Sequence, residues 1–445
     1  MIVEKLPFKL TAFDIANCFK NDNNLIFLDS NTGTSETSRY SFIFADPFYR
    51  FSSSKKDAFT KLKHLLSKYK ISQGNYDFPL GAAAGYVSYD AGRLTEHFKT
   101  TSTDELCWPY MEFGFYDTVL VYDNLKHTLC IVSTGLPENT PAKQKEKAKK
   151  RIELFFNRIS KTPASAKSLE KPGLSGKITS NFTKNQYYSA INKIKKYIEQ
   201  GDVYQVNLSQ RFYTNNSTSP FQIYKTIREK NNVPFGAYLK FDNREILSFS
   251  MERFLSIKGS AVETKPIKGT MPRGKTPAED AKIVKNLLTS KKNLAELLMI
   301  TDLERNDLGK VCSYDSIRVA KLHEAHKYAT VIHLISTITG TLHKNKTHLD
   351  CFKACFPGGS ITGAPKIRSM EIIDELEGIH RNVYCGSIGY FGFNKVTDFN
   401  IAIRTIMAQN KKLYFNSGGG ITYDSVPSAE YEETLHKVKT FLEAL

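Results

Sequence analysis

The sequence predicts an α+β protein, and three observations support this fold class. A chain of 445 residues is long enough for two lobes or for one large two-layer domain with an N-terminal half. Residues 1 to 160 are rich in strand patterns, such as the apolar run Leu25–Asp29. After residue 178, strand and helix patterns alternate to the C-terminus without an internal repeat.

The first 160 residues contain a hairpin pattern and a helical pattern. The apolar runs Val119–Tyr122 and Leu129–Val132 flank a polar connection and predict a β-hairpin. Residues 143–151 mix lysine, glutamate and alanine before an apolar cluster, which is typical of the solvated face of an amphipathic helix. Residues 161–178 are rich in Ser, Pro and Lys and predict a linker between region 1–160 and a catalytic domain, 179–445.

The predicted domain after the linker begins with a helix and a strand. Thr183 is a suitable N-cap, and Gly201 ends the helical pattern. One face of this predicted helix carries Tyr187, Ile191, Ile194 and Ile198. Residues 202–212 follow as a strand in which apolar and polar residues are mixed.

Charge and composition limit the function classes. A net charge of +17 is compatible with nucleic-acid binding, but much of it lies in local helical runs, so we expect no nucleic-acid partner. No apolar run approaches the roughly 18 residues of a membrane span, and the start resembles no signal peptide. The sequence therefore predicts a cytoplasmic protein without a membrane partner. Seven scattered cysteines predict reduced thiols, and we expect Cys351 and Cys355 to pack within a helix.

Lys268 lies in the segment ETKPIKGT, on constrained backbone. Pro266 restricts φ, and Gly269 removes side-chain bulk beside the lysine. An amine is a nucleophile only when deprotonated, and burial or nearby cations such as Lys265 and Arg273 would lower the pKa of Lys268. Taken alone, such a lysine is usually a surface charge.

Glu252 lies sixteen residues earlier, between apolar neighbours in SMERF. A carboxyl group in such surroundings can stay protonated and act as a general acid. The local alternative is an ion pair with Arg253.

Three further glutamates lie in two helical patterns. Glu296 is in LAELLMITDLERNDLG, and Glu430 and Glu433 are three residues apart on one face of SAEYEETLHKVKTF. Carboxylates from two helices are hard oxygen ligands that suit a Mg²⁺ ion with several waters. Glu432 points in another direction and is expected to face solvent. Surface helices also carry such glutamate pairs routinely.

Two glycine-rich stretches resemble phosphate-binding loops but fail their spacing. In PGGSITGAPK, Ala364 and Pro365 separate Gly363 from Lys366, so the Gly-Lys-Ser/Thr of a P-loop is absent. SGGGI, at 417–421, lacks the G-x-G-x-x-G spacing. Both stretches can still present backbone N–H groups to a carboxylate.

Together, these segments resemble the chorismate-using enzymes, which include anthranilate, aminodeoxychorismate, isochorismate and salicylate synthases. The resemblance is dense from about residue 180 to 445, and its motifs occur in one order: QVNLSQRF, SMERF, ETKPIKGTMPR, ELLMITDLERNDLG, HLISTITG, FPGGSITGAPKIRSMEIIDELE, YCGSIGYFGF, IAIRT and EYEETLHKV. It is looser before residue 160, in NNLIFLDS, SRYSF and GYVSYDAGR. The resemblance implies a large two-layer antiparallel β-sandwich with helices on the outside.

Two positions distinguish the chemistries within this family. The isochorismate and salicylate synthases of the family that this chain resembles have a lysine general base at the position of Gln205, where it takes a proton from water. A glutamine cannot take that proton, so water addition is disfavoured here. Anthranilate synthases have alanine at the position of Lys268, whereas PIKGT, like Asn207 in QVNLSQ, looks like aminodeoxychorismate synthase component I.

The resemblance also implies roles for the site residues. Lys268 would be a covalent nucleophile, Glu252 the general acid, and His333 a group beside the ring. Mg²⁺ would be held by Glu296 and Glu433, with Glu430 close by. The residues implied in substrate binding are Arg404, Tyr384, Ser360, Gly418, Gly419, Gly420 and Lys437.

The implied partners are chorismate and a separate glutaminase subunit that supplies ammonia. This chain lacks the glycines that a glutaminase cysteine requires, since Cys385 has Val383 and Ser387 two residues away. The implied product is 4-amino-4-deoxychorismate, on the way to 4-aminobenzoate and folate, and anthranilate synthesis is the alternative. Relatives bind tryptophan in an N-terminal pocket, and the residues in comparable places are Ser30, Arg39, Tyr40, Pro234 and Phe235. Asn293 departs from the family, where an acidic residue is common.

Overall fold

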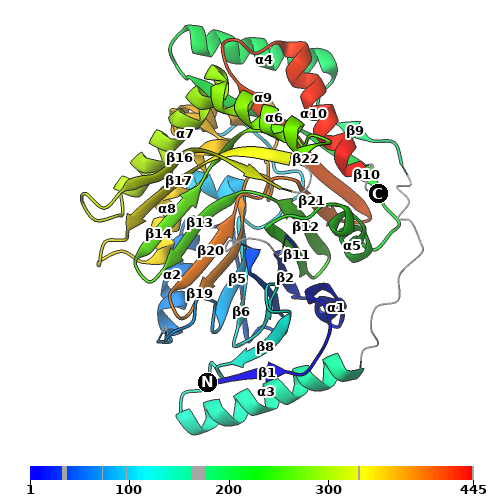
Figure 1. Ribbon diagram of the computed structural model, residues 1–445, viewed down its shortest axis with the longest axis vertical. Helices are drawn as coiled ribbons and strands as arrows, with labels where there is room; N and C mark the ends of the chain where they lie inside the picture. Colours follow the sequence, from blue (N-terminus) through cyan, green and yellow to red (C-terminus); the bar gives the residue numbers. More distant parts are fainter. Residues whose placement is uncertain (33–37, 73, 97, 162–175, 329–330, 443–445) are drawn as a thin grey trace.

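Two antiparallel β-sheets are stacked face to face, and helices cover their outer sides (Figure 1). A computed structural model describes residues 1–32, 38–72, 74–96, 98–161, 176–328 and 331–442. This architecture confirms the predicted α+β fold and its two-layer sandwich.

Within the described residues, the first sheet has twelve strands in the order β1-β8-β7-β3-β2-β11-β12-β21-β22-β10-β18, and β9 pairs with β10. The strands are β1 (Ile2–Leu6), β2 (Ile26–Asp29), β3 (Tyr40–Phe44), β7 (Thr118–Asp123), β8 (Thr128–Ser133), β9 (Thr179–Ser180), β10 (Gln205–Asn215), β11 (Phe235–Phe241), β12 (Arg244–Ser250), β18 (Gly363–Ala364), β21 (Thr405–Gln409) and β22 (Lys412–Ile421).

The second sheet has ten strands in the described segments, in the order β15-β17-β14-β13-β20-β19-β5-β6-β4, and β16 pairs with β17. The strands are β4 (Tyr49–Ser53), β5 (Ala82–Val87), β6 (Met111–Tyr116), β13 (Arg253–Lys258), β14 (Ala261–Lys265), β15 (Ile267–Pro272), β16 (Arg318–Lys327), β17 (Val331–Thr341), β19 (Ser387–Gly392) and β20 (Val396–Asn400).

The helices lie on the outside of the sandwich (Figure 1). They are α1 (Ala12–Asn17), α2 (Ala58–Lys68), α3 (Pro141–Lys161), α4 (Lys184–Glu199), α5 (Pro220–Lys230), α6 (Pro277–Thr289), α7 (Lys291–Gly309), α8 (His348–Cys355), α9 (Lys366–Glu377) and α10 (Pro427–Leu442), with 3₁₀ turns η2 (Tyr89–Leu94) and η3 (Gly359–Ile361). No helix of the described segments is both long and apolar enough to cross a lipid bilayer.

Strand β5 shows how the second sheet is buried on both faces. Alternate side chains of a strand point to opposite faces. Ala82, Ala84 and Tyr86 belong to the core between the two sheets, whereas Ala83 and Val87 belong to the core under the helices. A run of small apolar residues therefore serves two cores at once.

The two halves of the chain share both sheets. Strand β2 of the N-terminal region pairs with β11, where Asp29 lies opposite Gly236, and β5 pairs with β19. The predicted boundary thus separates two segments of sequence that fold around common sheets. Most of the predicted linker, residues 162–175, lies outside the described residues.

Several local predictions are confirmed. Strands β7 and β8 form the predicted hairpin, and residues 143–151 lie in α3. Thr183 caps α4 with a capping box to Gln186. Cys351 and Cys355 are buried in α8. The predicted strand at 202–212 begins three residues later, as β10.

A buried ion pair fixes α9 against β10, the strand that carries Gln205. The Arg381 guanidinium donates to Glu377 and, at 2.6 Å, to the Asn207 carbonyl oxygen. Glu377 in turn accepts from the Ser209 backbone N–H at 2.7 Å. Arg381 is 1% exposed and Glu377 6%, so each charge depends on the other.

We expect Arg381→Met to lower the free energy of unfolding by about 3–5 kcal/mol, because it leaves the Glu377 carboxylate buried without its partner. Thermal or denaturant unfolding measures this loss. The double variant Arg381→Met/Glu377→Gln is expected to regain part of it. A single variant as stable as the wild type would contradict the proposed dependence.

Candidate functional site

A cavity of about 750 Å³ lies where β10, β15, β17 and β22 meet α7 and α10. It brings together residues that are up to 231 positions apart, from Asn207 to Val438. The predicted site residues that line it are Glu252, Lys268, Glu296, His333, Ser360, Tyr384, Arg404, Gly418, Gly419, Gly420, Glu430, Glu433 and Lys437. Gln205 lies behind this lining and contacts it through Glu296.

A β-bulge places Lys268 at the cavity wall. Lys268 pairs with Leu334 and Thr270 pairs with His333, so Gly269 is the extra residue in β15. Gly269 has φ +71°, a left-handed conformation that favours glycine, and an added Cβ would lie 3.1 Å from Cγ of Asn293. Bulges re-aim neighbouring side chains, and here Lys268 and Thr270 both face the cavity.

The pKa of Lys268 is lowered, chiefly by burial. Lys437 lowers it further, while Glu296 and Glu252 oppose the shift. The predicted cations are not the cause. Lys265 pairs with Glu263 at 3.1 Å, and Arg273 pairs with Asp280 at 2.6 Å, so that part of the sequence prediction is wrong.

Glu252 is 3% exposed and lies beside Lys268. Burial raises its pKa to about 7, against the opposing effects of Ser360, the Ile267 N–H and Lys268. The alternative pairing with Arg253 does not occur, because Arg253 binds Glu263 at 2.8 Å and Asp398 at 2.9 Å. Near neutral pH, Glu252 therefore exchanges a proton readily, as a general acid requires.

His333 is a neutral ring held by a threonine. Burial lowers the pKa of His333 to about 4, and Thr270 Oγ1 lies 2.8 Å from Nδ1. Nε2 is buried without a hydrogen-bond partner among the described residues. This nitrogen is therefore free to contact a bound molecule.

Carboxylates from α7 and α10 face the glycine run of β22. A Cβ added to Gly419 would lie 3.3 Å from Oε2 of Glu430 and 3.7 Å from Oε1 of Glu433. On the other side, Nε2 of Gln205 donates to Oε2 of Glu296 at 3.3 Å. Glu432 is exposed, as predicted.

These carboxylates have the donor chemistry of a magnesium site. Burial alone would raise the pKa of Glu433, but its ion pair with Lys437 outweighs burial and lowers it, so Glu433 stays ionised. Within the described residues, no three Asp, Glu, His or Cys side chains form a complete metal-binding group. Mg²⁺ usually keeps several waters and takes only one or two protein carboxylates, so the residues present fit this ion.

Arg404 and Tyr384 line the same cavity, and Arg404 supplies a cationic group. The guanidinium of Arg404 has no ion-pair partner among the described acidic residues, and burial lowers its pKa. Arg404 has φ +51°, a left-handed conformation that is strained for a non-glycine residue. Such an unpaired, partly buried guanidinium suits a substrate carboxylate.

Lys437 and the glycine run form the cavity edge. The ammonium of Lys437 donates to the Gly418 carbonyl oxygen at 2.8 Å and pairs with Glu433 at 2.7 Å. A Cβ on Gly420 would lie 2.2 Å from Nε2 of Gln205. A side chain at position 420 would therefore displace the Gln205 amide.

Sequence reasoning assigned no role to Thr270 and Lys292. Thr270 holds His333, and the signal for it was its place directly after the bulge glycine. Lys292 lies 3.9 Å from Glu296, and the signal was the four-residue helical spacing. Asn293, the departure from the family pattern, packs against Gly269 instead of reaching a carboxylate.

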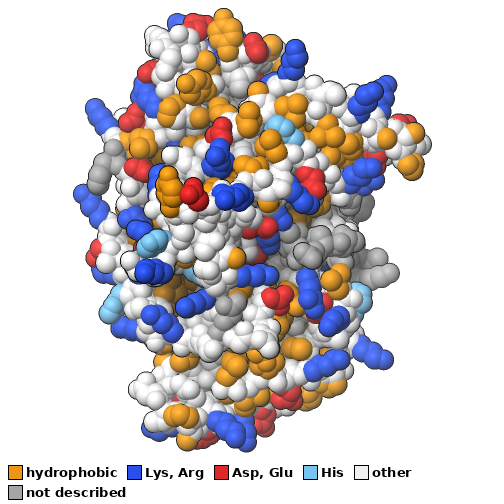
Figure 2. Space-filling view, turned by 60° about the vertical axis from the view of Figure 1, so that its left-hand side comes forward, with side chains coloured by type: hydrophobic (Ala, Val, Ile, Leu, Met, Phe, Trp, Pro, Cys, Tyr) orange, Lys and Arg blue, Asp and Glu red, His pale blue; other side chains and the backbone are white. Residues whose placement is uncertain are grey.

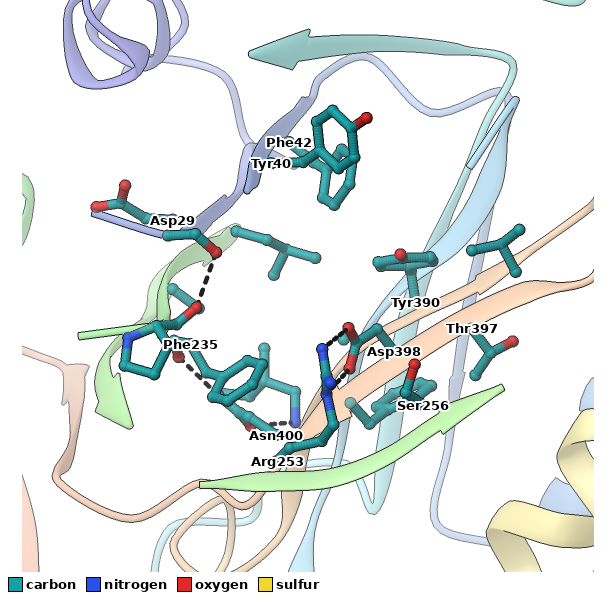
Figure 3. A pocket seen from close by; sticks show the side chains of 18 of the residues that line it. Asp29, Tyr40, Phe42, Phe235, Arg253, Ser256, Tyr390, Thr397, Asp398 and Asn400 are labelled. Carbon is teal, nitrogen blue, oxygen red and sulfur yellow. Dashed lines mark hydrogen bonds and ion pairs between the residues drawn. The ribbon is translucent and has the colours of Figure 1, made fainter. Parts of the chain in front are cut away.

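A second pocket of about 90 Å³ lies between the sheets, and all five residues of the predicted tryptophan site line it (Figure 3). Tyr40 and Phe235 project toward it from β3 and β11. Ser30 Oγ donates to the Pro234 carbonyl oxygen at 2.8 Å. The Arg253–Asp398 ion pair forms one wall.

The basic charge is spread over the face of the molecule seen in Figure 2. Figure 2 shows lysines and arginines interspersed with acidic and apolar side chains on the face in view. Such dispersion differs from the clustered stripe that is typical of nucleic-acid binding.

Comparisons with known proteins identify the family. Residues 23–443 match the model of the chorismate binding enzyme family. The chain is 38% identical to aminodeoxychorismate synthase component 1 of Bacillus subtilis, over 99% of this chain and 96% of that protein. It is 34% identical to anthranilate synthase component 1 of Acetivibrio thermocellus, over 98% and 92%.

A solved structure agrees with this assignment. Anthranilate synthase component I from Streptococcus pneumoniae superposes with a TM-score of 0.81 at 29% identity, covering 92% of this chain and 93% of that one. The family match spans most of the chain and includes every residue of the large cavity. This chain belongs to the chorismate-binding enzyme family.

Proposed function

We propose that this chain is aminodeoxychorismate synthase component I, which converts chorismate and ammonia to 4-amino-4-deoxychorismate. One observation carries the proposal: a buried lysine with a lowered pKa, Lys268, faces the same cavity as a protonatable acid, Glu252. A nucleophile and an acid in these states are what a displacement of a hydroxyl group requires.

The substrate's two carboxylates would bind at opposite sides of the cavity. Arg404 and Tyr384 would hold the carboxylate of the enolpyruvyl side chain. Glu296 and Glu433 would hold Mg²⁺, which when bound would neutralise and orient the ring carboxylate. Glu430, which also lies beside Gly419, would act through water. Ser360, Lys437 and Gly418–Gly420 would line the remaining contacts.

The covalent step would then use Lys268 and Glu252. The free amine of Lys268 attacks C2, both ring double bonds shift, and the C4 hydroxyl leaves as water with the proton of Glu252. Ammonia next attacks C4, both double bonds shift back, and the C2–nitrogen bond to Lys268 breaks. The sum is chorismate plus ammonia giving the 4-amino product plus water, and His333 would orient the ring.

Ammonia would come from glutamine through a separate glutaminase subunit, and the product would lead to 4-aminobenzoate and folate. Cys385, whose neighbouring residues are the most similar to those of a glutaminase cysteine, is fully buried. Burial raises the pKa of its thiol to about 12, so it would not form the thiolate that glutamine hydrolysis needs.

Anthranilate synthesis is the second candidate, and the relatives of that name at 34% identity favour it. Lys268 argues against it, since anthranilate synthases carry alanine at that position. Tryptophan is our proposed ligand for the second pocket, whose aromatic residues Tyr40, Phe42 and Tyr390 offer an apolar seat for an indole.

Incubation of the wild type with chorismate, ammonium and Mg²⁺ is expected to yield 4-amino-4-deoxychorismate, resolved by chromatography. With chorismate but no ammonium, mass spectrometry should detect an adduct on Lys268. Lys268→Ala should abolish this adduct, whereas Lys265→Ala, which changes a lysine paired with Glu263, should retain it. Anthranilate and pyruvate as the only products would refute the proposal, and an adduct in Lys268→Ala would remove the role of the lysine.

The pH dependence of kcat/KM should report the ionisation of Glu252. Because burial raises the pKa of Glu252 to about 7, the protonated acid is present below pH 7 and is lost as pH rises. We expect an alkaline limb in kcat/KM that begins near pH 7 and is absent in Glu252→Gln, whose residual rate should be about 10²–10⁴-fold lower. Retention of that limb in the variant would assign it to another group.

Removal of Mg²⁺ with a chelator should abolish product formation, and added Mg²⁺ should restore it. In calorimetric titrations with Mg²⁺ in the presence of chorismate, Glu433→Gln should weaken binding at least about tenfold, because a carboxylate ligand is lost. Glu432→Gln is the matched control, since Glu432 neighbours Glu433 but does not line the cavity. Equal Mg²⁺ affinity in both variants would refute the assignment of Glu433.

A further inference from the structure

A buried glutamate that the proposed chemistry does not use lies beneath the site. Glu304 is on α7, eight residues after Glu296, and is 8% exposed. Its side chain runs under the turn that carries Ser360, since a Cβ on Gly359 would lie 3.7 Å from Cγ of Glu304. A buried carboxyl group must be neutral or paired.

The hydrogen bonds of Thr264 decide the protonation state of Glu304. Thr264 Oγ1 lies 2.7 Å from the Phe254 carbonyl oxygen and 2.7 Å from Oε2 of Glu304. A hydroxyl group has one proton to donate, and a carbonyl oxygen can only accept. Two bonds this short are therefore satisfied together when Thr264 donates to Phe254 and Glu304 donates its own proton to Thr264.

The charges around Glu304 agree with a neutral acid. Lys366, the nearest cation, pairs with Asp307 and donates to the Cys355 carbonyl oxygen, and no ion pair reaches Glu304 among the described residues. Burial raises the pKa of Glu304 to about 8, Thr264 and Lys366 oppose this shift, and the acidic groups of Glu252 and Asp307 add to it.

Glu304 is connected to the reactive groups through one short segment. Thr264 is the penultimate residue of β14, four residues before Lys268, and the N–H of Ile267 donates to Oε1 of Glu252 at 3.3 Å. Glu304 thus holds one end of the segment from 264 to 268, and Glu252 holds the other. A charge on Glu304 would also act on Glu252 across the low-dielectric interior.

We propose that Glu304 is a positioning residue that works as the neutral acid: its O–H anchors Thr264 and so the Lys268 segment, and its neutrality keeps a second negative charge away from Glu252. The effect on the reaction rests on the proposed function, whereas the protonation state does not. If Glu304 ionised, Thr264 could satisfy only one of its two acceptors. The added charge would raise the proton affinity of both Glu252 and Lys268, and less Lys268 would be a free amine.

Thermal unfolding of wild type and Glu304→Gln as a function of pH tests the protonation state without substrate. A carboxyl group whose pKa is higher in the folded than in the unfolded chain contributes stability that is complete below the unfolded pKa and is lost as pH rises through the folded pKa. The Tm of the wild type should therefore fall relative to that of Glu304→Gln from pH 5 to about pH 8 and then level off. A difference that stays constant over this range would overturn the proposal.

The Glu304→Met variant separates the effect of the hydrogen bond donated to Thr264 from the effect of a charge at position 304. Methionine has a similar volume, carries no charge at any pH and cannot donate to Thr264. The same pH-dependent Tm difference is expected with this variant, which also keeps the test available if Glu304→Gln does not fold. Glu304→Gln keeps an N–H donor, so its aminodeoxychorismate formation should exceed that of Glu304→Met by about five- to tenfold, the value of one hydrogen bond. Equal rates would refute the anchoring role.

The alkaline limb of the rate profile gives a readout that a purely structural role would not change. Above about pH 8, log kcat/KM of the wild type should fall with a slope one unit steeper than that of Glu304→Gln, because the variant lacks one ionisation. Identical slopes would refute the link between Glu304 and the reaction. Should the chain form no aminodeoxychorismate at all, the proposed function fails, and the Tm comparison still decides whether Glu304 is neutral.

Discussion

The site depends on the withdrawal of Lys268 and Glu252 from water. Desolvation disfavours the charged form of each group, so it lowers the pKa of the amine and raises that of the acid. The two shifts bring the pKa values toward each other, and a free amine beside a neutral acid becomes accessible near neutral pH. In water the same two residues would form an unreactive ammonium and carboxylate.

The sheets that the two halves share supply this burial. Strands of the two halves join edge to edge in each sheet, and apolar residues of two hydrophobic cores line the cavity. The bulge at Gly269 then turns one strand so that Lys268 and the Thr270–His333 pair share the cavity wall. The buried pair Arg381–Glu377 holds β10, in the other sheet, and with it Gln205. The contacts that hold these strands in the core thus also hold the reactive groups in the cavity.

Much of the fold and the site membership was predictable from local patterns. The capping box at Thr183, the hairpin β7–β8 and the buried cysteines of α8 are local features, and each was confirmed. The causes of the pKa shifts were not predictable in the same way. Lys265 and Arg273 are close to Lys268 in sequence, but strand geometry directs them to Glu263 and Asp280, whereas Lys437 arrives from 169 residues away.

The role of Glu304 could not be predicted from the sequence for a related reason. On a helix, a glutamate between Leu303 and Arg305 is usually solvated, and only tertiary packing buries it against Thr264. Its neutral state follows from a hydroxyl group with one proton and two short contacts, a constraint that exists only in three dimensions. The same principle links all three groups: within this interior, Lys268, Glu252 and Glu304 each lose stability as ions, and their neutral forms are the ones that donate, accept and attack.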